Sequence, residues 1–230
     1  MKIGGFQKTT LLDYPGHVAA IIWTVGCNFR CPFCYNTELV EEKSELFSEE
    51  EILVFLEKRK DFLEGLVISG GEPFLQTDLK EFCKKVKKLG YKIKIDTNGT
   101  FPEKLKEFID EKLVDYLSMD IKAPEDKYSK LSGKKVDTKK IQESIEVIKS
   151  SDVEYEFKTT FVPEMLVKKD INSIGKWLNG SDKFYLQQFK NDIPTLSSEL
   201  VNLQTYSEEE LIDALETVKP FFKHCDIRGT

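Results

Sequence analysis

Short apolar segments alternate with amphipathic helical segments along most of this 230-residue chain, and that alternation limits the possible folds more than any other feature. Six segments are short and rich in Val, Ile and aromatic residues, which is typical of buried strands. They span about 17–23, 66–69, 91–96, 114–121, 154–162 and 184–189. Residues 6–12 predict a further, outer strand. Strands that alternate with helices predict a parallel sheet with right-handed crossovers.

Signals for helix ends lie between these strand segments. Ser48 and Ser207 are each followed three residues later by Glu, which is the pattern of a capping box at a helix start. Gly90 follows one helical segment, and Pro102 lies near the start of the next. Five expected helices span about 48–59, 77–89, 137–149, 168–178 and 207–220, and one more begins near residue 102.

Six strand–helix units are too few for a closed eight-stranded barrel. We therefore expect an α/β fold, a partial (β/α)6 TIM-like barrel that is open on one side. Residues 1–230 are expected to form one domain with its core at about 17–189. Residues 190–230 are expected to be a C-terminal extension that carries the final helix.

The composition is that of a soluble globular protein, with 40% apolar residues and a net charge of −6. The acidic balance argues against a nucleic-acid or membrane-surface partner. Neither a signal peptide nor an apolar run long enough to cross a bilayer is visible. Five cysteines, an odd number with three of them clustered, favour a reducing compartment over a disulfide framework. We therefore expect a cytoplasmic protein.

Polar or glycine-rich motifs follow four consecutive predicted strands. They are the cysteine-containing loop 26–36 and the motifs at 70–73, 96–99 and 120–122. Because the carboxyl ends of parallel strands meet at one rim, where barrels bind their ligands, we expect these motifs to form one site.

Cys27, Cys31 and Cys34 form a C-x3-C-x2-C run within the first of these loops. Three thiolates cannot pair off as disulfides without a remainder, but each can ligate one iron of a cubane cluster. Three local ligands leave one iron open, and an open coordination position is where a metal centre does chemistry. A zinc site is the alternative, although neither Cys83 nor Cys225 has a partner at ligand spacing.

The cysteine run, with aromatic Phe33 before its third cysteine, resembles the signature of the radical S-adenosylmethionine (radical SAM) superfamily. Segments 11–16 (LLDYPG) and 27–36 (CNFRCPFCYN) resemble those of glycyl-radical-enzyme activating enzymes. The activating proteins of anaerobic ribonucleoside-triphosphate reductase are the most similar, and the resemblance spans about 3–189.

This resemblance implies a [4Fe–4S] cluster on Cys27, Cys31 and Cys34, with SAM on the open iron. Reduction of the cluster would cleave SAM to a 5′-deoxyadenosyl radical that abstracts hydrogen from a glycine of a partner enzyme. The implied partners are a glycyl radical enzyme, namely anaerobic ribonucleotide reductase, and a reductant such as flavodoxin or ferredoxin. No catalytic residues are expected beyond the ligands of the cluster and of SAM.

The resemblance also implies contacts to SAM. Phe33 would pack on the adenine, with Tyr35 nearby. Glycines let a backbone approach a ligand, and Glu72 would accept from the SAM ammonium group, while Lys122 would face its carboxylate. The remaining expected contacts are Gly70, Gly71, Asp96, Asn98, Asp120 and Lys158.

Two further sets of residues follow from the resemblance. Asp96, Thr97 and Asp120 would form a monovalent-cation site, although Asp-Thr-Asn-Gly also reads simply as a turn. Asp13, Tyr14 and Pro15 would shape the access of the substrate.

The chain departs from the family pattern at two places. Glu164 stands where a glycine is usual, and Gln188 or Lys190 would replace a histidine that contacts SAM in relatives.

Two alternative functions remain open at this point. One is a radical SAM enzyme that acts on a small molecule, similar to a deazaguanine-forming synthase. The other is a non-catalytic interaction module that carries zinc or a cluster.

Overall fold

The computed structural model describes residues 1–229, and its eight strands form one sheet in sequence order. The strands are β1 Ile3–Thr10, β2 Ala19–Thr24, β3 Gly65–Gly70, β4 Lys92–Thr97, β5 Tyr116–Asp120, β6 Glu154–Phe161, β7 Ser181–Gln188 and β8 Phe222–Arg228. The α-helices are α1 Thr37–Val40, α2 Glu49–Arg59, α3 Leu79–Lys88, α4 Pro102–Asp110, α5 Tyr128–Leu131, α6 Thr138–Lys149, α7 Lys168–Trp177 and α8 Glu208–Glu216.

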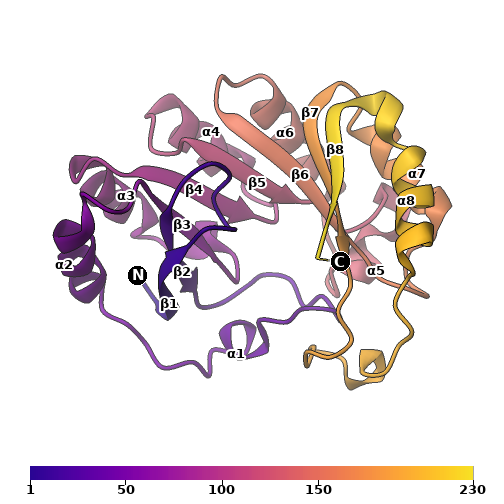
Figure 1. Ribbon diagram of the computed structural model, residues 1–230, viewed down its shortest axis with the longest axis horizontal. Coiled ribbons are helices and arrows are strands. Elements are labelled where there is room, and N and C mark those ends of the chain that lie inside the picture. Colours follow the sequence, from indigo (N-terminus) through magenta and orange to yellow (C-terminus); the bar gives the residue numbers. More distant parts are fainter. Residues whose placement is uncertain (230) are drawn as a thin grey trace.

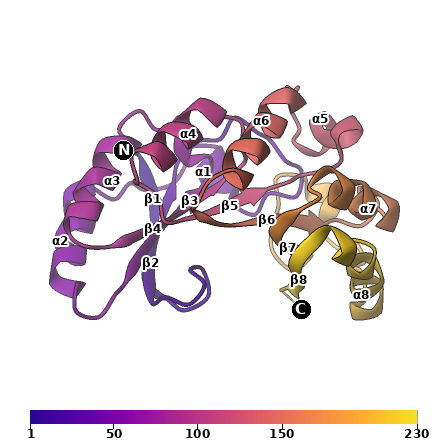
Figure 2. The same cartoon turned by 90° about the horizontal axis from the view of Figure 1, so that it is seen from above.

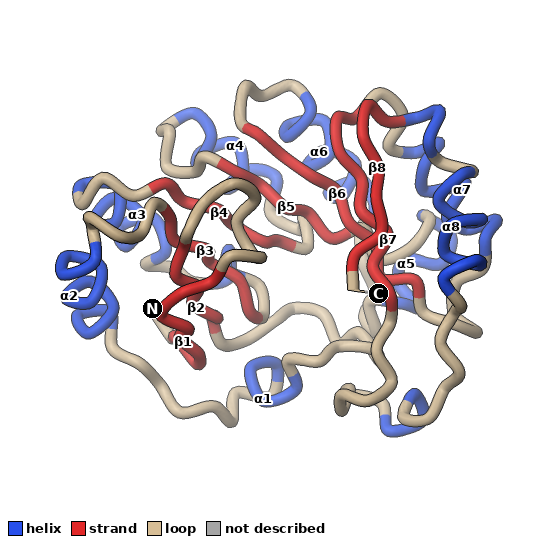
Figure 3. Tube along the Cα trace, viewed as in Figure 1, coloured by secondary structure: helices blue, strands red, loops and turns tan. Residues whose placement is uncertain are grey.

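The sheet curves into a barrel that stays open. β1 pairs antiparallel with β2, and each later strand pairs in parallel with the one before it. Within residues 1–229, β8 does not pair back with β1. Figures 1 and 2 show the longer helices on the convex side of the sheet, whereas the short α1 lies apart from them at the lower edge of Figure 1. Figure 3 shows the strands curving around the interior. The predicted partial barrel is therefore confirmed.

Strand side chains alternate between two buried layers. On β2, Ala20 and Ile22 join the large core beneath the helices. Ile21 instead faces the barrel interior, where it packs with Val67, Tyr14 and other residues in a small inner cluster. Strands buried on both faces read as continuous apolar runs, which is why the sequence signals for them are strong.

The two predicted capping boxes differ in the structure. At Ser207, the hydroxyl accepts from the backbone N–H of Glu210, whose carboxylate accepts from the N–H of Ser207. At Ser48, the hydroxyl accepts from the N–H of Glu51 at 3.1 Å, but no return bond forms. Both helices begin where the sequence predicted.

β8 was not predicted from the sequence, which indicated only a final helix in the region 190–230. Its residues alternate, with Cys225 and Ile227 beside Phe184 and Leu186 of β7 in the register. The intervening positions hold polar groups such as Asp226 and Arg228, so the segment lacks an apolar run. An edge strand with charged residues on one face gives only a weak sequence signal.

Glu164, which stands where the family pattern has glycine, adopts a left-handed backbone conformation. Its φ of 62° lies in the region that glycine adopts most readily. This conformation costs about 1–2 kcal/mol for a residue with a Cβ.

The layer between sheet and helices gives a test of the fold. Phe82 of α3 is fully buried, whereas Phe62 is 69% exposed. We predict that Phe82→Ala lowers the free energy of unfolding by about 3–5 kcal/mol, because it opens a cavity in the core. Phe62→Ala should change it by only about 0.5 kcal/mol. Denaturant titration of both variants checks this, and equal losses would contradict the arrangement.

Candidate active site

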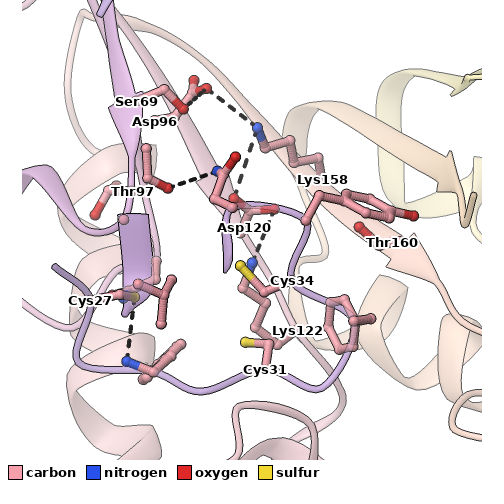
Figure 4. Close-up of a pocket in the computed structure, with 18 of the residues that line it drawn as sticks. Cys27, Cys31, Cys34, Ser69, Asp96, Thr97, Asp120, Lys122, Lys158 and Thr160 are labelled. Carbon is pink, nitrogen blue, oxygen red and sulfur yellow. Dashed lines mark hydrogen bonds and ion pairs between the residues drawn. The ribbon is translucent and has the colours of Figure 1, made fainter. Parts of the chain in front are cut away.

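A cavity of about 220 Å³ lies at the carboxyl ends of the strands. Figure 4 shows Lys122 beside Cys31 and Cys34, with Asp96 and Lys158 farther from the thiols. It brings together most of the expected site residues, namely Cys27, Cys31, Phe33, Cys34, Tyr35, Gly70, Gly71, Asp96, Thr97, Asn98, Asp120, Lys122 and Lys158. Motifs from four successive strand ends therefore meet in one place, as the parallel sheet requires.

The cysteines of this cavity are free thiols in a buried setting. Burial raises the pKa of Cys27 to about 11 and that of Cys31 to about 12, and it also raises the pKa of Cys34. Lys122 acts in the opposite direction at all three. A bound metal takes cysteines as thiolates, and its positive charge offsets the unfavourable effect of burial on these anions. The donor set therefore fits an iron–sulfur cluster.

Among residues 1–229, no three or more His, Cys, Asp or Glu side chains are grouped so that they could hold a metal ion.

Backbone contacts fix the cysteine loop against the loop after β3. The carbonyl of Gly26 accepts from the N–H of Glu72 at 2.9 Å. A Cβ on Gly71 would lie 1.9 Å from the same carbonyl, so only glycine allows this approach. The side-chain amide of Asn36 donates to the carbonyl of Gly70 at 3.1 Å. The Gly-Gly motif thus holds the loop that carries the thiols.

Glu72 differs from its expected role as a partner of the SAM ammonium group. Its side chain is fully buried and is not part of the cavity lining. Its carboxylate accepts from the N–H groups of Phe74 and Asn98 and from the hydroxyl of Thr97. Burial raises the pKa of Glu72 to about 7, and these hydrogen bonds oppose the rise. In this structure Glu72 joins the loops after β3 and β4.

The charged residues of the cavity form ion pairs across three strands. Lys158 lies 3.6 Å from Asp96 and 3.8 Å from Asp120, and Lys122 lies 3.4 Å from Asp120. Lys94 also bonds Asp96. The pKa of Asp96 lies well below its usual range, because Lys158 and Lys94 outweigh the effect of burial.

The three residues of the expected monovalent-cation site have other partners in this structure. Asp96 and Asp120 already face ammonium groups, and Thr97 donates its hydroxyl to Glu72. A cation placed between the two carboxylates would be repelled by the lysines.

The cavity residues that were not expected from the sequence include Thr160 on β6 and Gln187 on β7. From the sequence, Gln188 or Lys190 was the expected substitute for the histidine that contacts SAM in relatives. Successive strand residues point to opposite faces, so Gln187 reaches the cavity and Gln188 does not. The side-chain amide of Gln188 donates to the carbonyl of Tyr206 at 2.6 Å. Alternation along β7, with its register known, would have identified Gln187.

Asp13, Tyr14 and Pro15 lie at the opposite end of the barrel from the cysteines. They belong to the β1–β2 connection, which ends at Ala19, the amino end of β2. Tyr14 is 2% exposed and packs edge-on against Tyr116 with the ring centroids 5.9 Å apart. Its side chain fills the amino end of the interior, where it does not line the cavity.

Residues 190–197, here named the cover segment, pack against the cysteine loop. The N–H of Leu196 donates to the carbonyl of Cys34 at 3.2 Å, and that of Ser197 to Pro32 at 2.9 Å. These two hydrogen bonds hold the cover segment against Cys34 itself and against Pro32, which follows Cys31.

No helix in residues 1–229 is long and apolar enough to cross a membrane.

The contact between Gly71 and Gly26 gives a test of the site. We predict that Gly71→Ala shifts the cysteine loop and strongly lowers iron incorporation during anaerobic reconstitution, because the added methyl group meets backbone. Gly180→Ala is the control, since its φ is 82° but nothing lies within 4 Å of its added Cβ. The control should lose about 1–2 kcal/mol of stability yet load iron normally. Iron analysis decides, and normal loading of Gly71→Ala would contradict the packing described.

Comparison with known sequences is consistent with this geometry. The profile of the Radical SAM superfamily matches residues 21–169. A protein of Methanocaldococcus jannaschii, named as a glycyl-radical enzyme activating enzyme, is 34% identical and covers 98% of this chain and 95% of the relative. A second such protein from that organism is also 34% identical, over 78% of this chain and 66% of the relative.

Solved structures agree on the fold. SuiB of Streptococcus suis bound to S-adenosylmethionine superposes with a TM-score of 0.69 at 14% identity, over 91% of this chain and 50% of SuiB. A domain of a pyruvate-formate lyase-activating enzyme from Bacteroides vulgatus gives 0.58 at 18% identity, over 72% of this chain and 99% of that domain. The predictions of fold and of a [4Fe–4S] cluster with SAM as cofactors are confirmed at the level of the superfamily. By profile, relatives and cysteine motif, the chain belongs to the radical SAM superfamily.

Proposed function

We propose that this chain activates a glycyl radical enzyme, and that its partner is an anaerobic ribonucleoside-triphosphate reductase. The observation that carries the proposal is the convergence of three free thiols, one buried and two half-buried, with Lys122 in one cavity of an open barrel. The M. jannaschii relatives, which are named as glycyl-radical enzyme activating enzymes, support this branch. The run Leu-Leu-Asp-Tyr-Pro-Gly at 11–16 supports the reductase as partner.

In this proposal Cys27, Cys31 and Cys34 would hold the cluster, each through one iron, and would leave one iron open for SAM. When bound and reduced, the two groups supply a carbon radical that can take a hydrogen atom from a glycine Cα. The chain itself provides thiolate ligands, placement and exclusion of water. Phe33 and Tyr35 offer aromatic surface to an adenine, and the backbone at Gly71 allows close approach of a ligand.

The lysines of the cavity suit the anionic end of SAM. Lys122 and Lys158 share Asp120, so this part of the cavity holds more positive than negative charge. The pKa of Lys122 is raised, because Asp120 and Cys31 outweigh the effect of burial. A carboxylate placed beside these ammonium groups is stabilised by charge and by hydrogen bonds.

The architecture suits a macromolecular substrate. The sheet leaves one side of the interior open between β1 and β8, and a loop of a large partner can approach there (Figure 1). The cover segment packs against the cysteine loop through two backbone hydrogen bonds. We also propose a flavodoxin or ferredoxin as reductant and a cytoplasmic location, where thiols stay reduced.

The cluster assignment is tested with Cys31→Ala. Anaerobically reconstituted parent protein should be brown and should form 5′-deoxyadenosine from SAM with dithionite, whereas Cys31→Ala should lose both properties. Cys225→Ala is the matched control, because Cys225 lies on β8 outside the cavity, and it should keep both. Chromatography of 5′-deoxyadenosine decides. Full SAM cleavage by Cys31→Ala would exclude this cysteine as a cluster ligand.

The partner is tested separately by electron paramagnetic resonance. Reconstituted protein, SAM and reductant should produce a glycyl-radical doublet on the anaerobic ribonucleotide reductase of the same host. A reductase whose radical-site glycine is replaced by alanine is the control and should give no doublet. SAM cleavage without any doublet would instead favour a small-molecule substrate. Relatives named as GTP 3′,8-cyclases match only part of the chain, 54% in one case from Methanococcus maripaludis.

A further inference from the structure

Arg228, near the end of β8, reaches across the barrel interior to a buried carboxylate. Its guanidinium lies 3.3 Å from the ring centre of Tyr185 on β7, the strand between the two partners. Beyond this ring it donates two hydrogen bonds, at 2.7 and 2.8 Å, to the two carboxylate oxygens of Glu156 on β6. Figure 1 shows β6, β7 and β8 side by side. The contact therefore links the last strand of the chain to the middle of the sheet.

Glu156 depends on this arginine for its charge balance. Its side chain is 1% exposed, and its other partners, the hydroxyls of Tyr116 and Ser118, are neutral. A buried ion pair that loses one partner leaves an uncompensated charge, which is strongly unfavourable. If Glu156 stays ionised without Arg228, it will attract another cation.

Lys94 and Lys158 both act on Glu156 through their charge. Lys94 is held in a short ion pair with Asp96, so Lys158 is the cation that is freer to respond. It stands two residues after Glu156 on the same face of β6, about 7 Å along the strand, and it lines the cavity. Its present partners, Asp96 and Asp120, are 3.6 and 3.8 Å away, longer than a good hydrogen bond. A flexible lysine in loose ion pairs can turn toward a nearby unpaired carboxylate.

The charged side chains of the barrel interior carry one more positive than negative charge. The ion pairs of the interior involve the cations Lys94, Lys122, Lys158 and Arg228 and the carboxylates Asp96, Asp120 and Glu156, with Arg228 and Glu156 forming a separate pair. These four positive and three negative groups leave one positive charge unmatched. Since Arg228 matches Glu156 and Lys94 bonds Asp96, the surplus lies with Lys122 and Lys158 in the cavity.

We propose that Arg228 is a positioning residue for SAM: by neutralising Glu156, it leaves Lys158 free to face the carboxylate of the bound cofactor. This inference rests on the proposed function, since it assigns the surplus positive charge to that carboxylate. It gives β8 a part in cofactor binding although no residue of β8 lines the cavity.

The test measures binding without turnover. Cluster-loaded protein is titrated anaerobically, with no reductant, against SAM and against decarboxylated SAM, which lacks the carboxylate. Arg228→Gln should weaken SAM binding by about tenfold and leave binding of decarboxylated SAM within about twofold, because only the carboxylate contact is lost. A merely structural loss would weaken both ligands alike, which would overturn the proposal.

The double variant Glu156→Gln/Arg228→Gln is the matched control. It removes both charges, so Lys158 is no longer drawn away, and SAM affinity should return to within about threefold of the parent. A double variant that binds SAM as weakly as Arg228→Gln would contradict the proposal.

Glu156→Gln alone provides a test that does not need Arg228→Gln to fold. It removes the competitor for Lys158, so SAM should bind as tightly as in the parent or up to about fivefold more tightly. Weaker SAM binding with unchanged binding of decarboxylated SAM would overturn the proposal. Failure of the parent itself to bind SAM would instead refute the proposed function.

Discussion

The close approach of two backbones, at Gly26 and Gly71, is the contact on which the site depends. β2 and β3 are adjacent parallel strands, so the loops that follow them leave the same rim. Their contact is tight enough that a Cβ on Gly71 would overlap the carbonyl of Gly26. Because Cys27 follows Gly26 directly, the position of the first thiol is set by this backbone contact. Thiols placed by rigid strand ends can receive a cluster without rearrangement of the loop.

The barrel interior adds a second constraint, which is electrostatic. Acidic and basic side chains of β4, β5 and β6 face the barrel interior, where isolated charges would be very unfavourable. They are arranged as pairs, and the surplus of one positive charge remains at Lys122 and Lys158 beside the thiols. The same interior is closed by the aromatic ring of Tyr14 at the amino ends of the strands. A negatively charged group of a ligand is therefore attracted to the carboxyl ends of the strands, where the cysteines lie.

The sequence was sufficient for most of the fold, because strands buried on both faces leave continuous apolar runs and helices leave capping and glycine signals. It failed at β8, where the residues facing the interior are charged and the strand resembles a loop in composition. It also placed Glu72 in the cavity, because a motif shows which loop a residue belongs to but not which way its side chain turns. Gln187 was missed for the same reason, since the choice between neighbouring strand residues needs the register of β7.

The central claim is that three thiolates hold a four-iron cluster whose remaining iron is open to SAM. Mössbauer spectroscopy of ⁵⁷Fe-reconstituted protein, recorded before and after addition of SAM, tests this most directly. The account predicts that one iron in four changes its isomer shift when SAM binds, while the other three keep theirs. A spectrum in which SAM changes no iron, or in which the protein holds only a single iron site, would contradict the account.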